Sequence, residues 1–406
     1  MAVAFVVTTL VYPYVLVFAK KHNIVDNPSA RKLQRVPVPV MGGTAVFIGF
    51  LVTVFVGYLF VPNTQVLLLM ILLLVMYAIG VWDDIKDVSA AFRFLIEILV
   101  VWMMIILLDV EINNFYGFLG VNDIPDTVSV PLSLIAGVGI INAINLIDGV
   151  DRYCCSYGVM ACIAYAIIFY IAGNMTIFAL ALISVGALIP FFFHNVFGKT
   201  SKMFMGDGGS LMLGTLLTYF TFTALTTGRR CDMTFTESGL SLVALCLAIL
   251  AVPVFDTLKV MIFRVARGQS PFHPDKTHLH HIFIEMNFSH LSTSAMIVMG
   301  NVLIIGILLL SWWLGASITL QVIIVIVVSL LFTWGFYFFM DYHRRQNEGN
   351  GTELWQRVCN HGGTALSSTP AWKFISNIVD SKLLGGPHIP ENTPDTKAKQ
   401  DPRINN

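Results

Sequence analysis

The feature that most constrains this chain is a series of apolar runs, each long enough to cross a lipid bilayer. In one of them, VLLLMILLLVMYAIGVW, no side chain from Val66 to Trp82 carries a charge. Only 12% of the 406 residues are charged and 56% are hydrophobic, whereas soluble domains are about 25% charged. The composition therefore predicts an integral membrane protein.

Windows of about 20 largely apolar residues, the length that a spanning helix needs, predict an all-α polytopic fold. We expect eleven transmembrane helices, near residues 1–19, 41–60, 65–82, 94–110, 130–147, 157–173, 175–193, 209–227, 238–262, 294–314 and 317–340.

Basic residues are concentrated in alternate loops between these spans. The first loop holds five Lys and Arg residues between positions 20 and 35, whereas the loops on the other side hold only Arg229 and Arg230. Cytoplasmic loops carry an excess of Lys and Arg, so we expect the N-terminus outside and the C-terminus inside. An odd number of spans likewise places the two termini on opposite sides of the membrane.

The composition changes near residue 340. We expect a transmembrane domain over 1–340 and a largely irregular cytoplasmic tail over 341–406, which is rich in Gly, Ser, Thr, Asn and Pro. Within the tail, Trp372, Ile375, Val379 and Leu383 would share one helical face, so an interfacial helix is an open alternative. The formal net charge is zero, which argues against nucleic acid as a partner.

Polar residues gather at the predicted cytoplasmic ends of the spans, which indicates one site on that membrane face. The clusters are RKLQRVPVPVMGG (31–43), DDIKD (83–87), NAINLIDGVD (142–151), HNVFGKTSKMFMGDGGS (194–210) and PFHPDKTHLHH (271–281).

The two neighbouring aspartates of DDIKD could each contact a different group. Asp83 and Asp84 are neighbours, so on a helix they point about 100° apart and could face a metal ion and a phosphate. A solvated helix end, with no functional role, is the alternative.

Asn142, Asn145 and Asp148 are spaced by three residues and would form a polar stripe on one side of a helix. Such a stripe is costly in a membrane helix unless it has a function.

Asp207 stands between glycines, just before the next apolar span. Glycines allow close backbone approach, a helix N-terminus favours anions, and Mg²⁺ usually takes one or two carboxylates plus phosphate oxygens. A simple turn is the alternative.

The histidines that follow Lys276 lie close in sequence to Arg264 and Arg267, and this basic environment suits an anion better than zinc. Asp256 and Lys259, three residues apart, could form a structural ion pair or act in catalysis.

These clusters, in this order, resemble the polyprenyl-phosphate N-acetylhexosamine-1-phosphate transferases, the WecA/TagO-like members of glycosyltransferase family 4 that are related to MraY. The resemblance runs from about residue 20 to 285 and includes PVFDT, followed by SPFHPDKTHLHH. It implies transfer of N-acetylglucosamine-1-phosphate, or a related N-acetylhexosamine-1-phosphate, from a UDP-sugar to undecaprenyl phosphate, releasing UMP. The expected place is the bacterial cytoplasmic (inner) membrane, at the start of cell-envelope polysaccharide synthesis.

The resemblance also implies roles for individual residues. Asp207 and Asp84 would hold Mg²⁺, with Mn²⁺ as an alternative. Phe204 would stack on uracil. The expected catalytic residues are Asp83, Asp84, Asp148, Asp151, His278, His280 and His281, and the expected substrate-binding residues are Arg31, Lys32, Asn142, Asn145, Asn195, Phe204, Arg264 and Lys276.

The chain departs from the family pattern in two places. Arg152-Tyr153-Cys154-Cys155 stands where Gly-Leu-Ala is usual, and Gln34 stands where a His is common. A catalytically impaired family member is therefore one alternative, and a multi-pass transporter is another. A homodimer, and a direct or a covalent mechanism, are left open.

Overall fold

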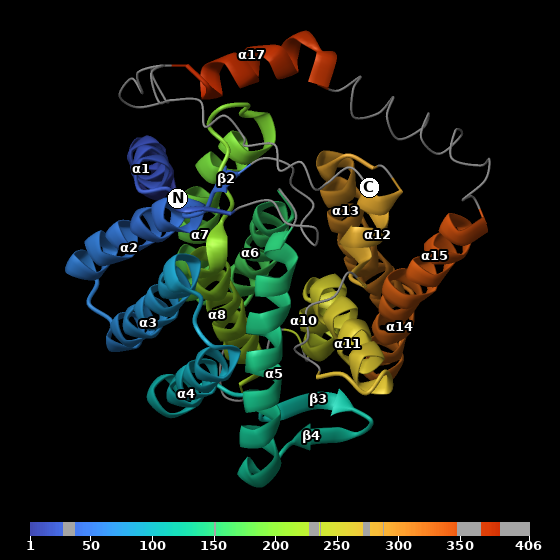
Figure 1. The fold of residues 1–406 in the computed structure, drawn as a ribbon. Coiled ribbons are helices and arrows are strands. Elements are labelled where there is room, and N and C mark those ends of the chain that lie inside the picture. Colours follow the sequence, from blue (N-terminus) through green and yellow to red (C-terminus); the bar gives the residue numbers. More distant parts are fainter. Residues whose placement is uncertain are drawn as a thin grey trace.

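The computed structural model describes residues 1–26, 37–149, 152–226, 235, 237–270, 277–286, 288–346 and 367–381. Within these residues, ten helices are long and apolar enough to cross a membrane, or eleven if a bent helix pair counts as one span. This agrees with the predicted eleven spans and shows a multi-pass, mostly helical membrane protein (Figure 1).

The long helices begin close to the predicted positions. They are α1 (Ala2–Lys21), α2 (Gly42–Phe60), α3 (Thr64–Lys86), α4 (Ala90–Leu108), α5 (Asp126–Leu146), α6 (Tyr153–Ile171), α7 (Met175–Phe197), α8 (Gly206–Leu225) and α13 (His290–Trp313). The last span comprises α14 (Ile318–Leu330), a π-helical turn (Leu331–Gly335) and α15 (Phe336–Gln346). Two short antiparallel pairs add to this helical fold, β1 (Val25–Asp26) with β2 (Val38–Pro39) and β3 (Asn114–Phe118) with β4 (Val121–Asp123).

Side-chain caps fix where several of these helices start. The side chains of Asn63, Ser89 and Asn174 accept hydrogen bonds from the backbone N–H three residues later, at the starts of α3, α4 and α7. Each cap satisfies a donor that has no partner within its helix.

Helix α8 lies at the centre of the bundle, and its whole spanning window is buried (Figure 1). It packs against α2, α3, α5, α6 and α10 (Leu242–Ile249). Several of its buried side chains are threonines. Their hydroxyl groups each donate to the backbone carbonyl four residues earlier, at Thr215, Thr218, Thr221 and Thr223. This internal bonding allows a polar helix to be buried among apolar neighbours.

The ninth predicted span, near 238–262, is broken rather than continuous. Helices α10 and α11 (Ala251–Ala266) meet at an angle of 71°. Pro253 has no N–H to donate and cannot pair with the carbonyl of Ile249. That carbonyl instead accepts from Tyr157 Oη (2.9 Å) and Asn301 Nδ2 (3.0 Å), while Asn301 Oδ1 accepts from Val252 N (3.0 Å). Asn301 of α13 thus satisfies the backbone groups that the bend exposes.

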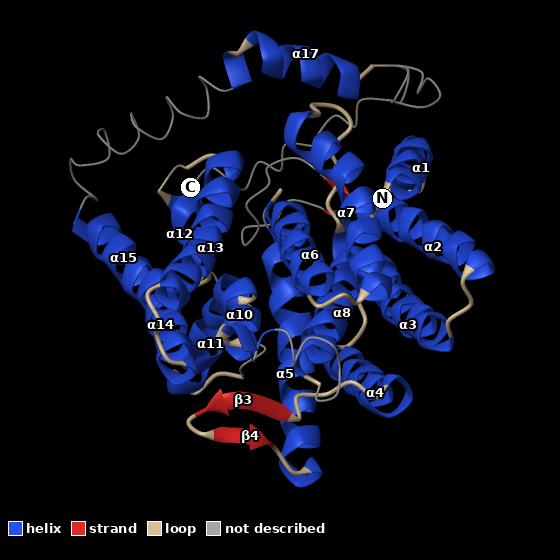
Figure 2. Cartoon of the chain, turned by 180° about the vertical axis from the view of Figure 1, so that it is seen from behind, coloured by secondary structure: helices blue, strands red, loops and turns tan. Residues whose placement is uncertain are grey.

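A tail helix, α17 (Pro370–Val379), lies across one end of the bundle near α7, and the β3–β4 hairpin lies at the opposite end (Figure 2). Trp372 packs on Phe197, with ring centroids 4.5 Å apart. Asp380 accepts from Lys199 N (2.9 Å) and Ser201 Oγ (2.8 Å). Partial burial alone would raise the pKa of Asp380, but these hydrogen bonds lower it below its usual value. Leu383, which was predicted to share a helical face with Trp372, lies outside the described residues.

Candidate active site

The site is built around the first turn of α8, where three backbones come unusually close. A Cβ on Gly43 would lie 2.2 Å from Gly209 Cα, and a Cβ on Gly80 would lie 2.4 Å from Asp207 O. Residues larger than glycine would push α2 and α3 away from this turn. The glycines therefore allow two helices to enclose Asp207.

The motif PVPVMGG and the residues just before Asp207 are joined by backbone hydrogen bonds. Phe204 N donates to Pro39 O (2.9 Å), Gly42 N donates to Phe204 O (2.8 Å), and Gly43 N donates to Met205 O (2.7 Å). Two motifs that are more than 150 residues apart in sequence thus form one structural unit.

Two carboxylates hold the start of α8. Asp84 Oδ1 accepts from Asp207 N (2.8 Å), and Asp84 Oδ2 accepts from Gly208 N (3.1 Å). Asp148, in the 3₁₀ turn Ile147–Gly149, accepts from Gly206 N at 2.9 Å. Asp84, Asp148 and Asp207 therefore converge on one helix N-terminus, and three N–H groups without partners in the helix are satisfied there.

Asp207 itself points into a polar cluster. Its Oδ1 accepts from Asn145 Nδ2 (2.5 Å), and Asn145 also donates to Ser210 Oγ (3.0 Å). Its Oδ2 lies 3.8 Å from Arg93 Nη1, and the side chain is 33% exposed. The Asp207 side chain is thus partly exposed and forms only a loose ion pair with Arg93, and the Asp83 carboxylate also lies within interaction distance of it.

Asp83 has a different environment from its neighbour. Its Oδ2 lies 2.9 Å from Arg93 Nη1, and its Oδ1 accepts from Val88 N at 2.7 Å. The two aspartates of the DD pair therefore face different partners, as their 100° separation on a helix predicts. The sequence interpretation did not single out Arg93 as a site residue.

Glu97 is a second residue that the sequence interpretation missed. It lies one turn after Arg93 on α4 and is fully buried. Asn142 Nδ2 donates to Glu97 Oε2 and, at 2.9 Å, to Val138 O. A buried acid in a spanning helix is a candidate functional residue. The sequence contains one signal for it, because Glu97 is directly followed by the uncharged apolar run ILVVWMMII.

The histidines form a second cluster beside the first. Asp256 accepts from Lys259 Nζ (2.7 Å) and Leu279 N (2.9 Å), and its Oδ2 lies 3.0 Å from His278 Nδ1. Lys259 is fully buried, with Nζ 3.9 Å from the centroid of Tyr337. Asp256 and Lys259 therefore form an ion pair, one of the two alternatives that the sequence left open. Asp256 also holds the start of α12 (Leu279–Glu285) through Leu279 N.

His280 and His281 lie next to His278, with ring centroids 5.4 and 6.3 Å from its ring. His280 is buried, and this burial, together with the neighbouring His281 and His278, lowers its pKa well below the usual value. The Tyr153 ring is 6.5 Å from His280, and Cys154 next to it lies 3.6 Å from Met205 Sδ. The start of α6 thus connects the two clusters.

Asn195 joins α7 to the segment before Asp207, and Arg152 joins the start of α6 to α7. Asn195 Nδ2 donates to Met203 O (3.2 Å), and Arg152 Nε donates to Asn195 O (3.1 Å). Arg152 has φ +79°, a conformation that glycine adopts more readily. Phe204 and Arg264 are both buried.

Four of the expected site residues, Arg31, Lys32, Asp151 and Lys276, lie outside the described residues. Within the part of the chain that is described, no three His, Cys, Asp or Glu side chains are arranged to hold a metal ion. Mg²⁺ needs only one or two carboxylates when substrate phosphates supply further oxygens. The partly exposed Asp207 carboxylate fits that requirement, and each oxygen of Asp84 beside it accepts one backbone hydrogen bond and has a further lone pair.

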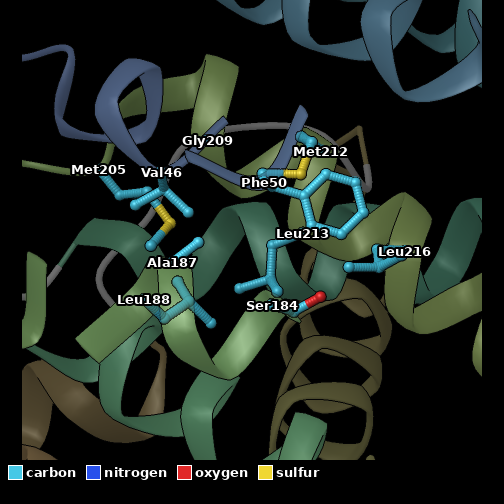
Figure 3. Close-up of a pocket in the computed structure, with 10 residues that line it drawn as sticks. All are labelled: Val46, Phe50, Ser184, Ala187, Leu188, Met205, Gly209, Met212, Leu213 and Leu216. Atoms are coloured by element: carbon cyan, nitrogen blue, oxygen red, sulfur yellow. The ribbon is translucent and has the colours of Figure 1, made fainter. Parts of the chain in front are cut away.

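A small apolar cavity lies behind Met205 and Gly209, between α2, α7 and α8 (Figure 3). Its volume is about 10 Å³, which is room for no more than about one water molecule. It is therefore a packing defect beside the site rather than a place for a substrate.

Comparison with known proteins agrees with the motifs. The model of glycosyl transferase family 4 matches residues 65–225, which run from α3 through α8. A Bacillus subtilis (strain 168) protein named "Probable undecaprenyl-phosphate N-acetylglucosaminyl 1-phosphate transferase" is 30% identical over 81% of this chain and 89% of its own length. An Escherichia coli (strain K12) protein named "Undecaprenyl-phosphate alpha-N-acetylglucosaminyl 1-phosphate transferase" is 28% identical, over 75% of this chain and 80% of its own length.

These names do not favour the transporter alternative. The similarity extends well beyond the acidic motifs, over most of both chains. It confirms the resemblance found in the sequence, and the chain belongs to glycosyl transferase family 4.

Proposed function

We propose that the chain transfers N-acetylglucosamine-1-phosphate from UDP-N-acetylglucosamine to undecaprenyl phosphate, giving undecaprenyl-diphospho-N-acetylglucosamine and UMP. The observation that carries this proposal is the convergence of Asp84, Asp148 and Asp207 on the first turn of α8. All three lie in the region that the family model matches. The names of the similar proteins support the sugar and the lipid acceptor.

The excess of basic residues in alternate loops supports an N-terminus outside and a C-terminus inside the bacterial cytoplasmic membrane. In that orientation the site faces the cytosol, where a soluble nucleotide sugar can reach it, while the bilayer supplies the acceptor.

The acceptor phosphate needs little help to become a nucleophile. The second pKa of a phosphate monoester is about 6, so much of it is a dianion at neutral pH. Both oxygens of Asp83 already have partners, Val88 N and Arg93. Asp83 is therefore better suited to hold Arg93 than to remove a proton or attack phosphorus, which favours direct attack by the lipid phosphate on the β-phosphorus.

The protein's part in such a transfer is positioning and charge neutralisation. Asp207, with Asp84 beside it, would hold Mg²⁺ or Mn²⁺, which when bound neutralises charge on the diphosphate oxygens. The histidine cluster with Arg264 and Lys276 would contact the donor diphosphate. Asn195 and Phe204 would contact the nucleotide, and Arg31 and Lys32 are further candidates for phosphate contact.

The test is to incubate the purified chain with labelled UDP-sugars, polyprenyl phosphate and Mg²⁺, and to identify the lipid product by mass spectrometry. We expect a lipid diphospho-N-acetylhexosamine, UMP in equal amount, and loss of both when EDTA is added. Absence of a lipid product with every donor would contradict the proposal and leave a catalytically impaired member.

The covalent alternative is tested by omitting the lipid acceptor. Direct transfer predicts no sugar-phosphate attached to the protein, and no exchange of labelled UMP into UDP-N-acetylglucosamine. A trapped adduct on an aspartate would instead establish the covalent route.

A further inference from the structure

Glu97 is an acid in an unusual position, fully buried on α4 one turn after Arg93. Its Oε2 accepts from Asn142. Its Oε1 makes no hydrogen bond with the described residues and lies 3.6 Å from Arg93 Nε. A buried carboxylate is costly unless it is paired, so Glu97 depends on Arg93 for compensation.

Arg93 is shared among three carboxylates. Its Nη1 lies 2.9 Å from Asp83 Oδ2 and 3.8 Å from Asp207 Oδ2, while its Nε faces Glu97. The contact with Asp207 is the longest of the three. The guanidinium therefore stands next to the oxygen that would receive a cation without closing tightly on it.

We propose that Glu97 is a positioning residue that holds Arg93 back from Asp207 and so keeps that carboxylate available to a divalent cation. The inference rests on the proposed function, because it takes Asp207 as the cation-binding carboxylate. In this proposal Glu97 acts only through Arg93, because its own side chain is fully buried.

The charge balance explains why this restraint is needed. A guanidinium binds carboxylates well and carries its charge permanently, so Arg93 and a divalent cation compete for Asp207. The Glu97 carboxylate attracts Arg93 from the other side, through Nε. A neutral side chain at position 97 would let the guanidinium move onto Asp207, and the cation would then have to displace it.

Glu97→Gln tests this competition, because glutamine has the same shape and can still accept from Asn142. We expect Mn²⁺ to bind the full-length purified Glu97→Gln chain about tenfold more weakly than the wild type, the lower end of the effect of one neighbouring charge. Free Mn²⁺ is measured by electron paramagnetic resonance without substrates, so the readout does not depend on turnover.

Three further variants separate charge from shape. Glu97→Asp keeps the charge and should lie closer to the wild type than Glu97→Gln does. The double variant Glu97→Gln with Arg93→Gln removes the competitor together with its restraint and should recover wild-type affinity or better. Glu111→Gln makes the same chemical change beyond the other end of α4, where Glu111 accepts from Ser129, and should change nothing.

Unchanged Mn²⁺ affinity in Glu97→Gln would overturn the inference, and so would equal losses in Glu97→Asp and Glu97→Gln. If the double variant stayed as weak as Glu97→Gln, Arg93 would not be the competitor and the inference would also fail. The proposed function is judged separately, by lipid product formed by the wild type with Mg²⁺. A wild type that makes product while Glu97→Gln binds Mn²⁺ normally would refute only the role of Glu97.

Discussion

Asp84 closes the first turn of the helix that begins next to Asp207. Its two carboxylate oxygens accept from the backbone N–H groups of Asp207 and Gly208, at 2.8 and 3.1 Å. Asp84 thus acts first as a cap contributed by a different helix. Its predicted contact with a metal ion, through the remaining lone pairs, stays a prediction.

Asp84→Asn should therefore lower stability as well as activity. An asparagine side chain has one acceptor oxygen, and its amide N–H₂ would face the N–H of Gly208. Loss of a cap and a buried donor without a partner each cost about 1–2 kcal/mol. We expect a lower thermal midpoint in detergent and strongly reduced formation of lipid product. A midpoint equal to that of the wild type would show that the cap contributes little.

Asp207→Asn should lower activity without lowering stability. Asparagine keeps the acceptor for Asn145 but removes the negative charge, so the fold should be retained. We expect a normal thermal midpoint, normal membrane insertion and a loss of turnover of at least about 100-fold, typical for removing one electrostatic group from a site. Activity and Mg²⁺ dependence like those of the wild type would exclude Asp207 as the cation ligand.

The spans and the acidic motifs could be predicted from the sequence because both depend on local patterns. Among the residues that the structure describes, apolar runs of spanning length form ten helices and one bent pair, and Asp84, Asp148 and Asn145 do meet at Asp207. The bend at Leu250 could not be predicted, because it needs Asn301 from a distant helix to satisfy the backbone.

Arg93 and Glu97 were missed for a related physical reason. On the sequence, both lie near the edge of an apolar run and resemble an ordinary helix end. Only packing against α5 brings Glu97 to Asn142 and makes it fully buried. Likewise, the spacing of Asp256 and Lys259 allowed either a structural ion pair or a catalytic role. Only the structure shows that the two side chains form an ion pair and that Asp256 also contacts His278.

Arg152→Gly is the test of the departure from the family pattern. Glycine would relieve the left-handed backbone of Arg152, worth about 1–2 kcal/mol, but would lose the Arg152 Nε bond to Asn195 O, worth about 1 kcal/mol. We expect a small change in thermal midpoint and a change in KM for the nucleotide sugar or in preference between UDP-N-acetylglucosamine and UDP-N-acetylgalactosamine. Unchanged kinetics with both donors would show that the departure is neutral.

His280 should make the stability of the protein depend on pH. Burial, together with the neighbouring His281 and His278, lowers the pKa of its imidazole well below the ordinary value of 6.5. The folded protein therefore holds His280 neutral, whereas the unfolded chain takes up a proton below about pH 6.5. The unfolded state binds more protons there, so stability falls as pH decreases, by up to about 1.4 kcal/mol per pH unit.

The measurement is the thermal midpoint of the purified chain between pH 5 and pH 8, compared with that of His280→Gln. We expect the midpoint of the wild type to fall below about pH 6.5 and that of His280→Gln to fall less. His22→Gln, a change at an exposed histidine beside Phe18, should behave like the wild type. Parallel pH curves for the wild type and His280→Gln would mean that the pKa of His280 is the same in the folded and unfolded states, and would contradict this prediction.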